Sequence, residues 1–112
     1  MQLPPLFDGC QFYFHGELQY PLPSRSELVE LVKLGGASVV SREPRAELVA
    51  AAGATTVPYH AAPGSQLENC GYFIVYDDKA TDRTNRLDGN ICCSKASWIL
   101  NCIASFKLLD VL

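Results

Sequence analysis

Two segments of the chain have the residue pattern of buried strands, and a third has the spacing of an amphipathic helix. Residues 10–14 (CQFYF) are rich in aromatic side chains, and residues 72–76 (YFIVY) form an apolar run typical of a central strand. Between them, Leu28, Leu31 and Val32 recur at intervals that place apolar side chains on one face of a helix. The pattern therefore predicts two strands and, between them, one helix.

The first helix has sequence signals at both ends. Ser24 and Glu27 form a capping-box pattern, in which the serine side chain accepts a hydrogen bond from the Glu27 amide. Gly35 and Gly36 stop the helix, because the residue that follows a helix commonly takes a positive φ, and we expect Gly36 to hold it. Residues 37–40 (ASVV) follow as a short second strand. Strand, helix and strand in this order predict a right-handed unit with parallel strands.

The C-terminal part of the chain continues the alternation. Residues 91–93 (ICC) are expected to form a short last strand, and Ser94 is a suitable N-cap for a last helix over residues 95–107. The polar segment 81–90 is the place expected for a short helix. One apolar stripe of the last helix, flanked by Trp98, comprises Ile99, Cys102, Ile103 and Phe106.

The whole order is β-α-β, a long loop, β, a short helix, β and α. Such alternation predicts an α/β domain with a small four-stranded parallel sheet and helices on both faces. The long loop covers residues 41–71, where prolines and glycines interrupt every pattern and only residues 46–54 could form a weak helical turn. Because Pro4 and Pro5 cannot enter a regular ladder, we expect residues 1–5 to be a linker and residues 6–112 to be the domain.

Composition narrows the class of protein. A chain of 112 residues with 48 % hydrophobic and 19 % charged residues has the size and balance of one globular domain. No apolar run approaches the ~20 residues of a membrane span, and the first residues lack a signal-peptide pattern. The formal charge of −3 argues against a protein whose main partner is bare nucleic acid. A soluble intracellular domain fits these values best.

The five cysteines favour a reducing compartment. Their number is odd, they lack the spacing of a disulfide framework, and no C-x-x-C motif occurs. No pair of them has zinc-site spacing with His15 or His60. We therefore expect reduced thiols that pack as small hydrophobic side chains, with no metal and no cofactor.

An enzyme is one alternative. Cys92 or Cys93 with His60 could supply a thiol nucleophile and its base, and Asp77 and Asp78 stand at a strand end, where ligands sit in parallel sheets. No G-x-S-x-G, P-loop or G-x-G-x-x-G motif supports such a site. The sequence therefore favours a protein that is not an enzyme.

A phosphate-binding or nucleic-acid-binding patch is a second alternative. Basic residues that could form such a patch occur in two loose groups along the chain. Each group has acidic residues among its neighbours and lacks interleaved aromatic side chains. The first group is Arg42 with Arg45, and the second is Lys79, Arg83 and Arg86. A solvated mixed surface is the favoured interpretation of both groups.

Two features of the chain resemble the BRCT domain family. The first is the pair Gly35-Gly36 after the first helix, and the second is Trp98-x-x-x-Cys102 in the last helix. We interpret all four residues as structural. The resemblance covers residues 6–109 and implies a four-stranded parallel sheet with the first and third helices on one face and the second helix on the other.

Further stretches resemble the second repeat of a tandem pair of BRCT domains. They are residues 6–10 (LFDGC), 40–44 (VSREP), 56–61 (TVPYHA) and 72–78 (YFIVYDD). Tandem pairs of this family bind phosphoserine peptides of repair and chromatin proteins. Their first repeat holds the phosphate with a Ser or Thr before a Gly after the first strand, and with a Lys of the second helix. His15-Gly16 stands at that place here, so the resemblance implies that this repeat does not hold phosphate in that way.

The second repeat of such a pair supplies the hydrophobic side of the peptide groove, which receives the residue three places after the phosphoserine. Leu22, before the loop proline, and Leu100, two residues after Trp98, stand at the matching positions. Leu22 could instead be an exposed loop leucine, and Leu100 could serve core packing. Arg42, in a Ser-Arg-x-Pro loop, matches a chromatin-contacting arginine of a family member, or is a solvated loop residue.

The resemblance implies a non-catalytic, nuclear interaction module of the DNA-damage response, within a ubiquitin ligase complex. The implied partners are a preceding BRCT repeat, phosphorylated repair or chromatin proteins and the nucleosome, with no membrane and no small-molecule substrate. The alternative is a stand-alone BRCT domain that binds a protein partner or a DNA end through its own surface.

Overall fold

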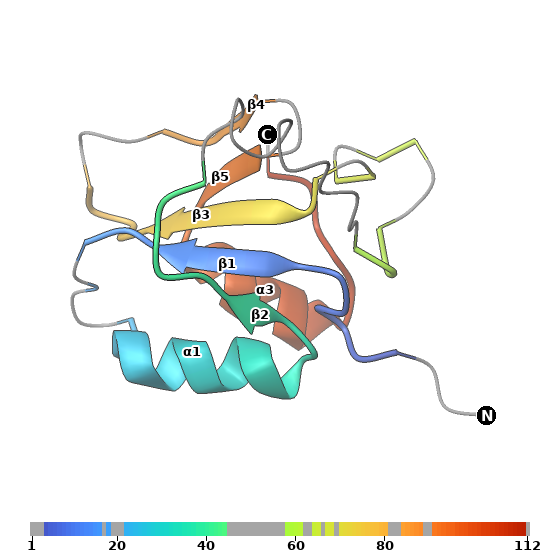
Figure 1. The fold of residues 1–112 in the computed structure, drawn as a ribbon, viewed down its shortest axis with the longest axis horizontal. Helices are drawn as coiled ribbons and strands as arrows, with labels where there is room; N and C mark the ends of the chain where they lie inside the picture. Colours follow the sequence, from blue (N-terminus) through green and yellow to red (C-terminus); the bar gives the residue numbers. More distant parts are fainter. Residues whose placement is uncertain are drawn as a thin grey trace.

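The computed structural model of the chain describes residues 4–16, 18, 22–44, 58–61, 64–65, 67–68, 70–80, 84–88 and 91–111. Its strands form one sheet, and its helices lie against that sheet (Figure 1). In chain order the elements are β1 (Gln11–Phe14), α1 (Arg25–Leu34), β2 (Ser38–Val39), β3 (Tyr72–Tyr76), β4 (Arg86–Asp88), β5 (Ile91–Lys95) and α3 (Ser97–Ser105).

The sheet has the strand order β2-β1-β3-β5-β4, and every neighbouring pair is parallel except β4 with β5. The predicted α/β class and its four parallel strands are confirmed. The sheet also has a fifth, antiparallel edge strand, so the short helix expected over residues 81–90 is wrong for residues 86–88. Leu87 accounts for the difference. It pairs with Cys92 of β5 and packs against the main core, whereas its neighbour Arg86 is exposed, and side chains that point alternately to the two faces are typical of a strand. Residues 81–83 and 89–90 lie outside the described residues.

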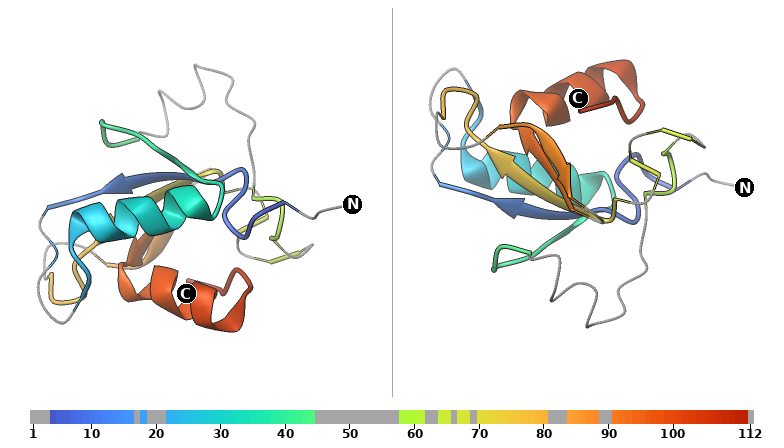
Figure 2. Two further views of the ribbon diagram at one scale, coloured as in Figure 1. Left: turned by 90° about the horizontal axis from the view of Figure 1, so that it is seen from below. Right: turned by 90° about the horizontal axis from the view of Figure 1, so that it is seen from above.

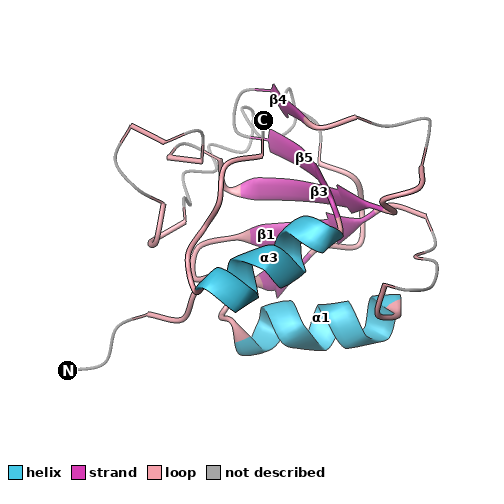
Figure 3. Ribbon diagram, turned by 180° about the vertical axis from the view of Figure 1, so that it is seen from behind, coloured by secondary structure: helices cyan, strands magenta, loops and turns pink. Residues whose placement is uncertain are grey.

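The described helices α1 and α3 lie on the same face of the sheet (Figures 2 and 3). Leu28 and Val32 of α1 share one buried cluster with Ile99 and Cys102 of α3 and with the inward side chains of β1, β3 and β5. Helices were expected on both faces, and in the described part of the chain they cover one. No helix in these residues is long and apolar enough to cross a membrane.

The opposite face of the sheet is buried too. Ile74, Tyr76, Ile91 and Cys93 form a second apolar cluster there. The Tyr76 hydroxyl donates a hydrogen bond to Asn85 Oδ1 at 2.6 Å, and Asn85 Nδ2 donates to the Val111 carbonyl at 3.2 Å. These bonds tie the C-terminal end of the described chain to the edge of the sheet.

The ends of α1 follow the sequence signals. The Ser24 hydroxyl accepts from the Glu27 amide at 3.3 Å, as predicted. Gly36 has a φ of +89°, also as predicted, and a Cβ there would meet Pro5 at 3.1 Å. Gly35 has an ordinary negative φ, but a Cβ on it would lie 2.6 Å from the buried ring of Phe7. The two glycines are therefore needed for different reasons.

The start of α3 differs from the prediction. Ser94 is not its N-cap, because Ser94 is a fully buried residue of β5 that pairs with Val75. The helix begins at Ser97, whose amide donates to Asp78 Oδ1 at 3.0 Å. A carboxylate from the turn after β3 thus caps α3 across 19 residues of sequence.

The predicted apolar stripe of α3 is partly wrong. The buried residues are Trp98, Ile99 and Cys102, whereas Ile103 is 38 % exposed and Phe106 is 70 % exposed. Helix α3 therefore buries the face that carries Trp98, and the Trp98 ring stacks on Phe73 with ring centroids 5.2 Å apart.

The long loop expected over residues 41–71 is confirmed for its described residues, which contain no helix or strand. The helical turn expected over residues 46–54 lies outside the described residues.

Candidate functional site

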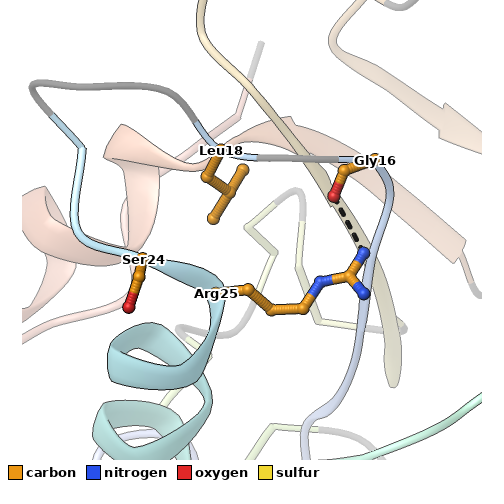
Figure 4. Close-up of a pocket in the computed structure, with 4 residues that line it drawn as sticks. All are labelled: Gly16, Leu18, Ser24 and Arg25. Atoms are coloured by element: carbon orange, nitrogen blue, oxygen red, sulfur yellow. Dashed lines mark hydrogen bonds between the residues drawn. The ribbon is translucent and has the colours of Figure 1, made fainter.

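A pocket of about 510 Å³ opens where β1 ends and α1 begins (Figure 4). Its described lining consists of Gly16, Leu18, Ser24 and Arg25. The pocket lies at the carboxyl ends of the parallel strands, which is the usual place for ligands in a parallel sheet. The pocket combines a cation, a hydroxyl and an apolar wall.

Arg25 joins the helix to the loop that frames the pocket. Its Nη2 atom donates to the carbonyl of Phe14 at 2.7 Å and to that of Gly16 at 2.8 Å. Gly16 has a φ of +67°, a conformation that residues with a side chain rarely adopt. A guanidinium from the first residue of α1 therefore holds the last residue of β1 and the turn after it. Figure 4 shows the bond to Gly16.

Helices α1 and α3 begin at the same end of the sheet (Figure 3). Leu22 precedes α1 by three residues, and Leu100 is the fourth residue of α3. Each is half-buried and packs against the main core. Neither belongs to the described pocket lining, where Leu18 is the apolar residue. Sequence reasoning missed Leu18, although a leucine between the polar residues Glu17 and Gln19 is a detectable signal.

His15, at the end of β1, faces a carboxylate. Its Nδ1 atom lies 3.8 Å from Glu43 Oε1, and both side chains are about one-third exposed. Arg42, the neighbour of Glu43 in the loop after β2, is exposed. The structure thus brings His15 and the loop of Arg42 to the same edge of the sheet.

The thiols have the properties of core residues. Cys92 and Cys102 are fully buried and Cys10 is nearly so, and burial raises the pKa of all three thiols, that of Cys102 to about 11. Burial also raises the pKa of Cys70. A protonated thiol is a poor nucleophile, so these residues lack the activation that a catalytic cysteine needs.

The other proposed catalytic groups have structural contacts. His60 Nε2 lies 2.7 Å from the Pro4 carbonyl, and the His60 ring contacts Tyr59 and Phe106. Asp77 Oδ1 accepts from the Lys79 amide at 2.7 Å, and Asp78 caps α3. Within the described ranges, no three His, Cys, Asp or Glu side chains are placed to hold a metal ion.

The two groups of basic residues are only partly described. Arg42, Lys79 and Arg86 are exposed, and Arg45 and Arg83 lie outside the described residues. These three residues therefore lie on two different loops and on the edge strand β4, and they form no continuous stripe along one element.

Trp98 and Cys102 hold the chain that follows α3. Trp98 Nε1 donates to the Leu109 carbonyl at 2.9 Å, and the Leu109 amide donates to Cys102 Sγ at 3.4 Å. Trp98 is 7 % exposed and Cys102 is fully buried. Both residues therefore contact the core on one side and the C-terminal segment on the other.

Comparison with known proteins places this architecture in a family. Residues 5–112 match the family described as BRCT domain. The chain is also 35 % identical over 110 residues to human BRCA1-associated RING domain protein 1 and 34 % identical to the mouse protein. The match covers 97 % of this chain and 14 % of each relative, so the chain spans about one-seventh of their length. The expected family is confirmed: the chain belongs to the BRCT domain family.

Proposed function

We propose that this domain is the second repeat of a tandem BRCT pair and acts as a non-catalytic protein-interaction module of the DNA-damage response. The human and mouse relatives are named for an association with BRCA1 and for a RING domain. We further propose that this domain belongs to a nuclear protein of a ubiquitin ligase complex, whose partners are phosphorylated repair or chromatin proteins.

The pair of His15 and Glu43 is the observation that carries this proposal. In a first repeat, a hydroxyl beside the glycine would bind phosphate, and here an imidazole stands before Gly16. The Glu43 carboxylate lies 3.8 Å from that imidazole, and a carboxylate repels a phosphate dianion. This edge therefore suits a repeat that leaves the phosphate to its neighbour.

Leu22 and Leu100 supply the apolar side of the peptide groove in this proposal. Each is half-buried, so part of each side chain remains accessible at the end of the sheet where α1 and α3 begin. A peptide side chain that buries ~100 Å² against them would gain ~2–3 kcal/mol. Charge-assisted hydrogen bonds to phosphate in the preceding repeat would supply the remaining affinity.

Exposed apolar side chains on both helices support a preceding repeat as the partner. Leu34, the last residue of α1, is 81 % exposed, and Ile103 and Phe106 are exposed at the end of α3. Such residues mark interaction surfaces when they gather on one side of a domain. A preceding repeat that packs against α1 and α3 would remove them from water.

A peptide titration tests this function. The ligand is a phosphoserine peptide with phenylalanine three places later, and the proteins are the 112-residue chain and the same chain joined to its preceding repeat. We expect binding by the joined pair alone, and its loss on Leu100→Arg but not on Lys107→Gln, an exposed control beyond α3. Equal binding by the single chain would show that it holds phosphate itself and would favour the stand-alone domain.

Arg42 is the proposed nucleosome contact. It is exposed in the loop after β2, and a guanidinium suits both acidic histone surfaces and DNA phosphate. We expect Arg42→Ala to weaken nucleosome binding by the full-length protein, measured by gel shift, while Arg86→Ala on the edge strand does not. Equal losses with both variants would indicate unspecific charge attraction and contradict the assignment.

A further inference from the structure

We propose that Arg25 and Asp78 are positioning residues that set the specificity of the peptide groove without touching the peptide. The inference rests on the proposed function and deepens it. Each side chain makes long-range hydrogen bonds at the end of the sheet where Leu22 and Leu100 lie. We call the loop that carries Leu22 the loop wall of the groove, and the part of α3 that carries Leu100 the helix wall. Together Arg25 and Asp78 determine the distance between these two walls.

Arg25 fixes the loop wall. The chain between β1 and α1 carries Leu18 and Leu22, and the guanidinium holds its beginning through the carbonyls of Phe14 and Gly16. Both acceptors bind the same nitrogen, Nη2, at 2.7 and 2.8 Å. The loop therefore starts from a backbone position set by the first residue of α1.

Asp78 fixes the helix wall. The residue before α3 is Ala96, which has no side chain that can cap the helix, and the Ala96 amide donates instead to the Tyr76 carbonyl at 2.8 Å. The Asp78 carboxylate then accepts from the next amide, that of Ser97, at 3.0 Å. The start of α3 is thereby tied to the end of β3. Leu100 follows one helical turn later, so its direction depends on this start.

The partial burial of the groove leucines makes these two contacts decisive. A fully buried side chain is held by its neighbours on every side, whereas Leu22 and Leu100 are half-buried and keep one side accessible. Their accessible sides are placed by the backbone that carries them. Arg25 is itself exposed and Asp78 is half-buried, so neither residue is part of the apolar core.

This role predicts a selective loss. The phosphate is bound by the preceding repeat, so the preference for phosphoserine over serine should survive when either residue is replaced. The preference for phenylalanine over alanine three places later should fall, because it depends on the spacing of the two walls. A residue that only stabilised the domain would change both preferences together or neither of them.

The experiment uses the full-length protein and three peptides: phosphoserine with phenylalanine, phosphoserine with alanine, and serine with phenylalanine. We expect Arg25→Ala and Asp78→Ala to lower the phenylalanine-over-alanine ratio of affinities at least fivefold while the phosphoserine-over-serine ratio stays constant. Asp78→Asn should restore the first ratio, because its side-chain carbonyl still accepts from the Ser97 amide. Lys33→Ala, an exposed cation at the other end of α1, is the matched control and should change neither ratio.

The outcomes separate this inference from the function on which it rests. If the unsubstituted protein shows no preference for phosphoserine, the proposed function fails and the inference fails with it. If it shows both preferences and the variants keep them, the inference alone is overturned. A parallel fall of both ratios would assign the residues to general stability and would also overturn it. Arg25→Ala, at an exposed position, keeps the test decisive even if Asp78→Ala does not fold.

Discussion

The two sides of α3 differ in what they contact. One side carries Trp98, Ile99 and Cys102, which are buried against the sheet and against the C-terminal segment. The other side carries Leu100, half-buried, and Ile103, 38 % exposed. A single helix of nine residues thus separates the contacts that stabilise the domain from those available to a partner.

The difference lies in the aromatic neighbours. Trp98 stacks on Phe73 and lies near Phe7 and Phe12, so the buried side of α3 meets a continuous layer of rings. The other side meets no such layer among the described residues. Substitutions on the two sides should therefore affect different measurements, stability on one and binding on the other.

The largest effect is expected for Trp98→Ala. The substitution removes the stacked ring and the hydrogen bond to the Leu109 carbonyl, and loss of a buried tryptophan costs ~3–5 kcal/mol. Denaturant unfolding measures the change, with Ile103→Ala on the exposed side as the control. A Trp98→Ala variant that melts within about 2 °C of the parent would contradict this division of the helix.

A smaller loss is expected for Gly36→Val, at the end of the other helix. A β-branched residue would be forced into a φ of +89° against Pro5, and strain of this kind costs ~1–3 kcal/mol. Gly36→Asn is the control, because asparagine tolerates the left-handed region better. Equal unfolding free energies for the two variants would show that contact with Pro5, rather than φ, decides the cost.

Alkaline pH should destabilise the buried side of α3. Burial raises the pKa of Cys102 to about 11, above its ordinary value of 9.0, so the folded state keeps a proton that the unfolded state loses. This contribution to stability is complete below pH 9 and is lost as the pH rises through 11. Urea unfolding at a series of pH values should show the decline, and Cys102→Ala should make it shallower. An identical decline in both proteins would assign it to other groups.

The smallest effect on stability is expected for Ile103→Ser. A surface substitution of this kind changes the free energy of unfolding by less than ~0.5 kcal/mol. It should nevertheless weaken association with the preceding repeat, measured by calorimetry with the two repeats supplied as separate chains. A large loss of stability would show that Ile103 belongs to the core side of the helix.

Local signals predicted much of the fold because they act between neighbouring residues. The Ser24 cap, the positive φ of Gly36 and the apolar run of β3 each involve a few adjacent positions. The family followed from the glycine pair and from Trp98 with Cys102, which form a recognisable sequence pattern although they contact Phe7, Phe73 and Leu109 elsewhere in the chain. These features could be identified without knowledge of any distant contact.

The candidate site was less predictable, because its contacts join distant positions. Leu22 and Leu100 were named from the family resemblance, and their role in binding remains a prediction. Leu18 and Arg25 were missed, since the hydrogen bonds from Arg25 to Phe14 and Gly16 cross the loop between β1 and α1. No periodicity of a single segment reveals such a contact.

The sequence by itself determined the α/β class, the parallel strands and the start and end of α1. Only the tertiary structure decided which side of α3 is buried, that residues 86–88 form an edge strand, and that Asp78 instead of Ser94 caps α3. The physical reason is that apolar spacing shows which side chains avoid water, whereas the surface that covers them comes from elsewhere in the chain. Trp98 is buried because Phe73 lies opposite it, and that pairing exists only once the sheet has formed.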